Sequence, residues 1–311
     1  MSKEINLDLM NEKILRKSVV FTVIFTIIAL TVGFITSSQV ILFDGIFNLV
    51  GIALTYLSVS AMKFMKKKDE WNYPFGKATF EPFIAIVQYA IILYICVSNI
   101  TSAIHTILDG GHDVEILSGV VYGAFSTIYN FIIFTSLKLL TQKHQTAISQ
   151  VEVDQWKFSF LLGVGILVGF SISFSLNFTQ FYFLRVYSDP LLTIIITLLF
   201  GKTALFTMKD RIRELMQASP SVELIDFITE KITEIDAYYQ FENEIFRLAK
   251  VGNKIIIELD YIIKPNSRLD SIILQDELRY KLTNAFSEIP YEKWININFT
   301  GDAYHTIHAM D

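Results

Sequence analysis

The stretch that decides the fold spans residues 18–36 and reads SVVFTVIFTIIALTVGFIT, without a charged side chain. A helix of about 20 mostly apolar residues crosses the hydrocarbon core of a bilayer. The stretch follows a polar segment and has no small-residue cleavage site at its end, so it differs from a cleaved signal peptide. It predicts a membrane-spanning helix near the start of the sequence.

Further stretches of the same character follow at residues 40–64, 80–105, 114–139, 156–176 and 187–208. The 311 residues are 52% hydrophobic and 18% charged, whereas a soluble domain is about 25% charged. After Lys209 no apolar run reaches the length of a span. We therefore expect an all-α membrane domain of six transmembrane helices over residues 1–211, followed by a soluble domain over residues 212–311.

Lys and Arg are concentrated in alternate loops between the predicted spans, and such loops are typically cytoplasmic. These residues precede the first span, follow the second, border the loop between the fourth and fifth, and follow the sixth: Lys3, Lys13, Arg16, Lys17, Lys63, Lys66, Lys67, Lys68, Lys138, Lys143, Lys157, Lys209, Arg211 and Arg213. The opposite loops contain one basic residue, Arg185. This asymmetry predicts a multi-pass protein with both termini in the cytoplasm, and we expect the cell inner membrane.

Residues 212–311 have the pattern of a small α/β domain. We expect a helix over 222–236, strands over 241–250 and 254–263 joined at Gly252-Asn253, a helix over 269–286 and a strand over 294–299. This αββαβ order is ferredoxin-like. Residues 214–311 contain 9 Lys and Arg against 17 Asp and Glu, a net charge of −8. An acidic domain argues against nucleic acid as a partner and favours cations.

Four polar residues lie in or beside the predicted spans, where a carboxylate is costly and therefore suggests a function. Asp44 and Asn48 are four residues apart and share one helix face. Asp154 precedes the fifth span, and Asp189 begins the sixth beside Pro190. Other interpretations stay open: Asp44 as an interfacial carboxylate, Asn48 as a helix-packing residue and Asp154 as a solvated loop residue. For Asp189 we favour an N-cap of the sixth span.

Several motifs resemble the cation diffusion facilitator family of divalent-metal/proton antiporters. The segment Asp44–Asn48 (DGIFN) resembles the family pattern Asp-Gly-X-X-[Asn/Asp], and residues 73–82 (YPFGKATFEP) resemble its Tyr-Pro-Phe-Gly loop. Ser188-Asp189-Pro190 is similar to the family's Ala-Asp-Pro, and Leu215–Pro220 to the motif that leads into its cytoplasmic domain. The resemblance implies a homodimer that exports a divalent metal by alternating access in exchange for protons, with its C-terminal domains paired.

The sequence departs from the family at the metal ligands. Alignment on the glycines of the fifth span places Asp154 at the usual His position and Phe158, which cannot bind a metal, at the usual Asp position. The predicted transport site is therefore Asp44, Asn48 and Asp154. Tyr73 and Lys77 occupy loop positions that often bind a second metal in the family, and the ligand positions of the C-terminal domain fall at apolar residues near Ile272-Ile273 and at residues 299–302.

These ligands also set the expected cargo and the rival functions. Oxygen ligands without an imidazole favour harder ions, so we expect manganese or ferrous iron before zinc, and no cofactor. No phosphate-binding loop or nucleophile motif is found, so an enzyme is not expected. A transport-impaired relative acting as a membrane scaffold or metal sensor is the alternative. His305 and His308 could also bind a metal.

Overall fold

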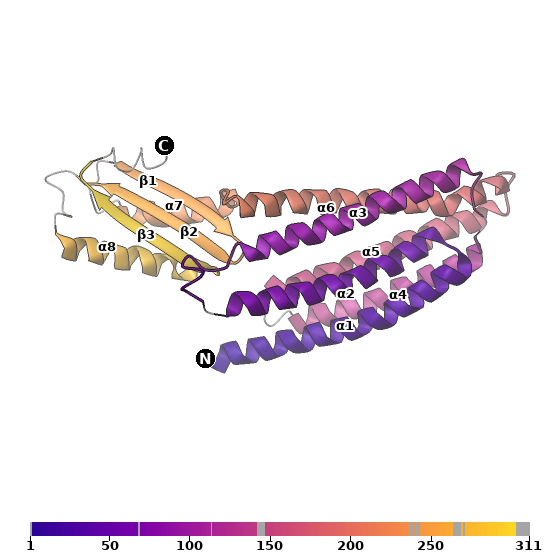
Figure 1. The fold of residues 1–311 in the computed structure, drawn as a ribbon, viewed down its shortest axis with the longest axis horizontal. Helices are drawn as coiled ribbons and strands as arrows, with labels where there is room; N and C mark the ends of the chain where they lie inside the picture. The colour runs from indigo at the N-terminus through magenta and orange to yellow at the C-terminus, as the bar shows by residue number, and fades with distance from the viewer. Residues whose placement is uncertain are drawn as a thin grey trace. The chain divides into compact units, whose positions relative to one another are not determined.

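The computed structural model describes residues 2–67, 69–112, 114–141, 147–236, 239, 243–263, 269 and 271–302. The first part of the chain contains α1 (Ser2–Thr36), α2 (Gln39–Lys66), α3 (Phe80–Leu108), α4 (Ile116–Thr141), α5 (Ala147–Leu176), the 3-10 turn η1 (Tyr182–Tyr187) and α6 (Ser188–Leu215). Six helices in this described part are long and apolar enough to cross a membrane. All six predicted spans are therefore confirmed, and α6 continues beyond the expected residue 208 to Leu215 (Figure 1).

The chain divides into two compact units, and each unit is made of two separate stretches of the sequence. The first unit comprises Met1–Val59 and Gln88–Phe206, and the second comprises Ser60–Val87 and Thr207–Asp311. The second unit thus includes the end of α2, the following loop and the start of α3 together with the C-terminal part. The boundary expected near residue 211 stays a prediction.

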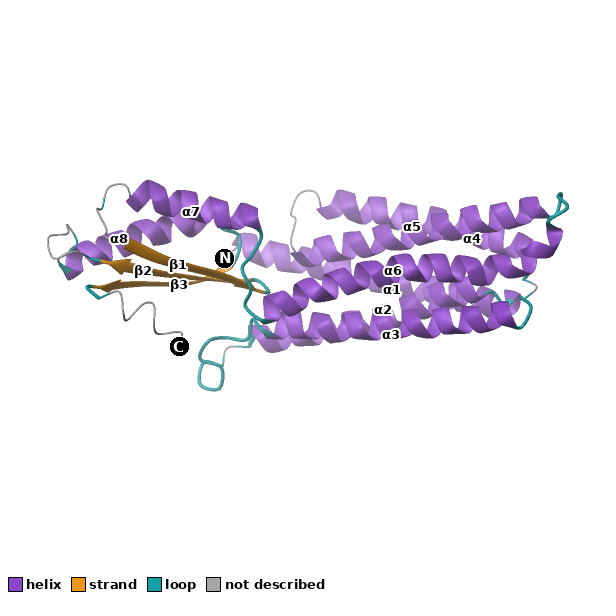
Figure 2. Cartoon of the chain, turned by 90° about the horizontal axis from the view of Figure 1, so that it is seen from above, coloured by secondary structure: helices purple, strands orange, loops and turns teal. Residues whose placement is uncertain are grey.

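The first unit is a bundle whose helices lie side by side (Figure 2). Its buried core takes Phe25 from α1, Phe43 from α2, Tyr122 from α4, and Ile166 and Phe170 from α5. Small residues allow α4 and α5 to approach closely, as is common between membrane helices. A Cβ on Gly123 would lie 2.7 Å from the Leu167 Cα, and one on Gly163 would lie 2.8 Å from the Ser126 Oγ.

The C-terminal part contains α7 (Val222–Asp236), β1 (Asn243–Val251), β2 (Lys254–Ile262), α8 (Ile272–Ala285), the 3-10 turn η2 (Phe286–Glu288) and β3 (Glu292–Thr300). This order confirms the predicted αββαβ domain. The central strand β2 pairs with β1 in antiparallel and with β3 in parallel orientation. The parallel pairing requires a crossover connection, which α8 provides.

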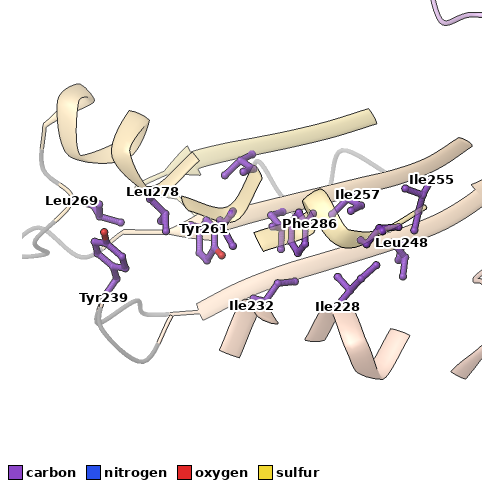
Figure 3. Packing of buried hydrophobic residues seen from close by; sticks show 14 residues of the cluster. Ile228, Ile232, Tyr239, Leu248, Ile255, Ile257, Tyr261, Leu269, Leu278 and Phe286 are labelled. Atoms are coloured by element: carbon purple, nitrogen blue, oxygen red, sulfur yellow. The ribbon is translucent and has the colours of Figure 1, made fainter. Parts of the chain in front are cut away.

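The core of this domain lies between one face of the sheet and its two helices (Figure 3). Successive strand side chains point to opposite faces, and the alternate residues of β2 are fully buried: Ile255, Ile257, Leu259 and Tyr261. These side chains pack with Ile228 and Ile232 of α7 and with Leu278 and Leu282 of α8. Because that face is covered only when both helices fold onto it, the helices and the sheet form one core.

Within the second unit, the β1–β2 hairpin contacts the loop between α2 and α3. The Asn253 backbone N–H donates to the Glu81 Oε2 at 3.0 Å, and the Lys254 Nζ donates to the Phe75 carbonyl at 2.9 Å. Gly252 has a φ of +56° at the turn, and a Cβ there would lie 2.6 Å from the Glu81 Oε2. The predicted Gly252-Asn253 turn therefore both closes the hairpin and lets the loop approach it.

Candidate metal transport site

The first turn of α2, which precedes Asp44 in the helix, is held in place by side-chain hydrogen bonds. Ser38 lies just before α2, and its Oγ accepts from the Ile41 backbone N–H at 3.3 Å, as an N-cap residue does. The same hydroxyl donates to the Asp189 Oδ1 at 2.6 Å, and the Gln39 N–H donates to the Asp189 Oδ2 at 2.7 Å. Asp189 is buried, so these bonds join the first turns of α6 and α2.

This arrangement corrects one expectation. We expected Asp189 to cap its own helix, but its carboxylate accepts hydrogen bonds from the N-terminus of α2 instead. The carboxylate is favoured there because the first backbone N–H groups of a helix have no partner within the helix and present positive partial charge. The sequence motif identifies a capping residue but does not say which helix it caps.

Asp44 lies just over one turn into α2 and is completely buried, with 0% exposure. The Asn48 Nδ2 donates to the Asp44 Oδ1 at 2.8 Å, which confirms that these residues share a helix face. The Tyr122 hydroxyl of α4 donates to the Asp44 Oδ2 at 2.8 Å. Each carboxylate oxygen therefore has a donor, and both donors are neutral groups.

A buried carboxylate without a charged partner is costly, because neutral donors replace water but do not balance the charge. Such residues inside membrane helices usually serve transport of ions or protons. A cation at Asp44 would supply the missing positive charge. The interpretation of Asp44 as a merely interfacial carboxylate does not explain its complete burial.

The structure brings Asp44 and Asn48 together but does not bring Asp154 to their level. Asp154 belongs to α5, and its side chain lies outside the described part of the chain. Gly123, next to Tyr122, lies against Leu167 of α5. From residue 154 to residue 167 a helix rises about 20 Å at about 1.5 Å per residue. The membership of Asp154 in the site stays a prediction.

Other positions singled out by the sequence are occupied by packing interactions. Phe158 is exposed on α5, and its ring centroid lies 6.2 Å from that of Phe200. The Lys77 Nζ donates to the Phe64 carbonyl at 3.2 Å and to the Lys67 carbonyl at 2.9 Å, and it lies 4.8 Å from the centroid of the Tyr73 ring. The ammonium group thus satisfies carbonyls at the end of α2, where the helix favours a cation.

The possible ligands of the C-terminal domain are not assembled into a site. Ile272 and Ile273 are exposed apolar residues, whereas His305 and His308 lie outside the described residues. In the described part of the chain, no group of three or more His, Cys, Asp or Glu side chains is placed to hold a metal ion. Asp44 and Asn48 therefore remain the described pair best suited to a cation.

Sequence reasoning missed Tyr122 because no motif includes it. The available signal was the polar content of the fourth span, in which Tyr122, Ser126 and Asn130 recur every four residues. That spacing places all three on one face of α4. Only the packing of α4 against α2 shows that Tyr122 reaches Asp44.

The described part of the chain thus combines six helices long and apolar enough to cross a membrane, a completely buried carboxylate near the start of α2, and an α/β domain that follows α6 in the sequence. Residues 15–216 match the model of the cation efflux transmembrane domain, and the chain belongs to the cation efflux family, also called the cation diffusion facilitators. The zinc transporter ZitB of Yersinia pestis is 21% identical over 311 residues, covering 96% of each chain. The resemblance inferred from the motifs is confirmed, and the function of the chain is divalent metal efflux at this family level.

Proposed function

We propose that this chain exports a divalent metal ion from the cytoplasm in exchange for protons, with Asp44 as the central ligand. The observation that carries the proposal is the completely buried Asp44 carboxylate, whose donors Tyr122 and Asn48 are both neutral. A metal needs a deprotonated ligand, so proton uptake by the carboxylate favours release of the metal. Metal uptake into proteoliposomes with a proton gradient of opposite direction tests the exchange.

The orientation and the role of Asp154 belong to the same proposal. Both termini are cytoplasmic, as the alternation of basic loops indicates. In that orientation α5 begins on the cytoplasmic side, and Asp154 in its early turns meets the cation before it reaches Asp44. Asp154 then acts as a ligand at the cytoplasmic entrance of the path. The missing ligand at Phe158 motivates the scaffold or sensor alternative. That alternative predicts that the full chain binds metal but does not transport it across the membrane.

The proposed site prefers Mn²⁺ or Fe²⁺ to Zn²⁺ because its donors are oxygens, whereas zinc favours imidazole and thiolate. The printed name of the Yersinia relative points to zinc instead. In competition uptake by proteoliposomes, we expect wild type to take up Mn²⁺ at least several-fold faster than Zn²⁺. Asp154→His should shift this ratio towards Zn²⁺.

The matched control for this test is Asp210→His, which makes the same exchange at an exposed position of α6. It should leave the ratio unchanged. A wild type that prefers Zn²⁺, together with an unaltered ratio in Asp154→His, would show that the oxygen-ligand argument and the role of Asp154 are both wrong.

We propose further that the chain is a homodimer that does not need metal in its C-terminal domain. The apolar residues Ile272 and Ile273 at the expected ligand positions support this proposal. Size-exclusion chromatography of the full chain in detergent should give the same dimer mass with and without EDTA. Dissociation by EDTA that is reversed by added metal would contradict the proposal.

A further inference from the structure

The loop between α2 and α3 presents an exposed aromatic side chain next to a basic segment. Four lysines lie within six residues at or just after the end of α2: Lys63, Lys66, Lys67 and Lys68. Lys63 and Lys67 are exposed. Trp71 is 93% exposed, more than any other large apolar residue among those described. We call Lys63, Lys67 and Trp71 the Lys–Trp patch.

The hydrogen bonds of the loop place Trp71 within a tight turn. The Tyr73 backbone N–H donates to the Asp69 carbonyl at 3.0 Å, and the Asn72 Nδ2 donates to the Asp69 Oδ1 at 2.9 Å. Figure 2 shows the loop projecting beyond the ends of α2 and α3. The turn therefore holds Trp71 in an exposed position.

The neighbouring aromatic residues of the loop pack against other parts of the same unit. The Tyr73 ring lies 5.8 Å from the Phe64 ring of α2, and the Phe75 ring lies 5.8 Å from the Trp294 ring of β3, measured between centroids. Among the described residues Trp71 has no such ring partner. An indole ring with its polar N–H is suited to the boundary between lipid and water, where Trp is enriched.

The length of α2 places the Lys–Trp patch at the level of the lipid headgroups. Its apolar span, Gln39–Met65, has 27 residues, which corresponds to about 40 Å at about 1.5 Å per residue. The hydrocarbon core of a bilayer is about 30 Å thick, and the headgroup regions bring the thickness to about 40–45 Å. When the start of α2 lies at one interface, the end of the helix and the following loop reach the other.

We propose that the Lys–Trp patch binds an anionic phospholipid headgroup and holds the α2–α3 loop on the membrane surface. A cluster of lysines next to a membrane helix attracts anionic lipids. Residues 63–70 contain four Lys against one Asp and one Glu, a net charge of +2, so the attraction survives the two carboxylates. In the proposed orientation the lipid belongs to the cytoplasmic leaflet. The inference does not rest on the metal site.

A second copy of this chain is the competing occupant of the patch. In a dimer with two-fold symmetry, a patch near the axis contacts its own copy. Lysines would then face lysines, which is unfavourable at an interface. An anionic headgroup supplies the opposite charge, so charge complementarity favours the lipid.

Lipid binding at the patch also bears on the C-terminal domain. The Lys254 Nζ of the β1–β2 hairpin donates to the Phe75 carbonyl, and the Asn253 N–H donates to the Glu81 carboxylate. These contacts and the patch belong to one compact unit. A lipid that holds the loop therefore restrains the hairpin as well.

The experiment is fluorescence quenching of the full chain in vesicles of phosphatidylcholine and phosphatidylglycerol. Bromine atoms near the headgroup end of the acyl chains, which quench Trp fluorescence, are carried by phosphatidylglycerol in one sample and by an equal mole fraction of phosphatidylcholine in the other. The signal of Trp71 is the difference between wild type and Trp71→Phe. We expect brominated phosphatidylglycerol to quench this signal about twofold more strongly, and the excess to shrink at high salt.

The variant Lys63→Gln/Lys67→Gln tests the role of charge. Each lysine near an anionic surface favours the lipid about fivefold, so the two brominated lipids should quench this variant almost equally. The matched control is Lys231→Gln/Lys281→Gln, which removes two lysines from α7 and α8 of the C-terminal domain. It should keep the excess quenching of the wild type.

Two results would overturn the inference. Equal quenching of wild type by both brominated lipids would show that the patch does not select anionic lipid. No quenching by either lipid would show that Trp71 is covered by protein, such as a second copy of the chain, or lies in water. Neither result bears on Asp44, because the measurement involves no metal.

Discussion

Replacing Asp44 with alanine is expected to reduce metal uptake by proteoliposomes about a hundredfold or more, to the level of liposomes without protein. Asp44 is the completely buried carboxylate to which the Tyr122 hydroxyl donates, and neutral oxygens alone do not replace the hydration of a divalent ion. Removing one partner of a buried charged pair costs about 3–5 kcal/mol, and each 1.4 kcal/mol corresponds to about tenfold in affinity. The measurement is the initial rate of Mn²⁺ uptake.

Two companion variants distinguish the loss of metal binding from the loss of the folded state. Asp44→Asn keeps the size of the side chain and an oxygen that can accept from Tyr122, so it should fold and melt like wild type while failing to transport. Asn48→Asp adds a second carboxylate and should bind the metal more tightly. Transport at the wild-type rate by either Asp44 variant would eliminate the assignment of Asp44 as the central ligand.

Replacing Asp189 with alanine is expected to give the largest loss of stability. The carboxylate accepts from the buried Ser38 hydroxyl at 2.6 Å and from the partly buried Gln39 N–H at 2.7 Å, and its removal leaves both donors without this acceptor. Hydrogen bonds to a charged group are worth about 1.5–3 kcal/mol each. We expect a loss of about 3 kcal/mol and a melting temperature lower by roughly 6–12 °C. Transport should fall as well, because the start of α2 positions Asp44.

The matched control is Asp210→Ala, which removes an exposed carboxylate from the same helix. Its melting temperature should equal that of the wild type. If Asp189→Ala melts with the control, the carboxylate does not hold the two helices together. Loss of transport without loss of stability would instead assign Asp189 a direct role in the cation path.

The fold could be predicted from the sequence because its signals are long and local. The first span, 18–36, is a continuous apolar run, and the helix over 222–236 has apolar residues at helical spacing, so neither depends on distant contacts. The strand expected at 241–250 is β1, Asn243–Val251, in the structure, and residues 241–242 lie outside the described part of the chain. The grouping of residues 60–87 with the C-terminal part could not be predicted, because it depends on contacts such as that between Asn253 and Glu81.

Only part of the candidate site could be predicted from the sequence. The pair Asp44 and Asn48 lies within one helix, so its geometry follows from the helical repeat. Tyr122 joins them only through the packing of α4 against α2, and the partner of Asp189 depends on which helix end lies beside it. The level of Asp154 depends on the register between α4 and α5, which small residues such as Gly123 set through contacts that no motif encodes.

The most direct test of the central claim is the proton flux that accompanies metal entry. Proteoliposomes with a pH-sensitive dye inside receive an inward Mn²⁺ gradient, and wild type is predicted to release protons from the lumen at a rate that follows metal uptake. Asp44→Asn is predicted to give neither flux, while the Asp210→Ala control gives both. Metal entry by wild type without proton movement, or wild-type fluxes in Asp44→Asn, would contradict the account.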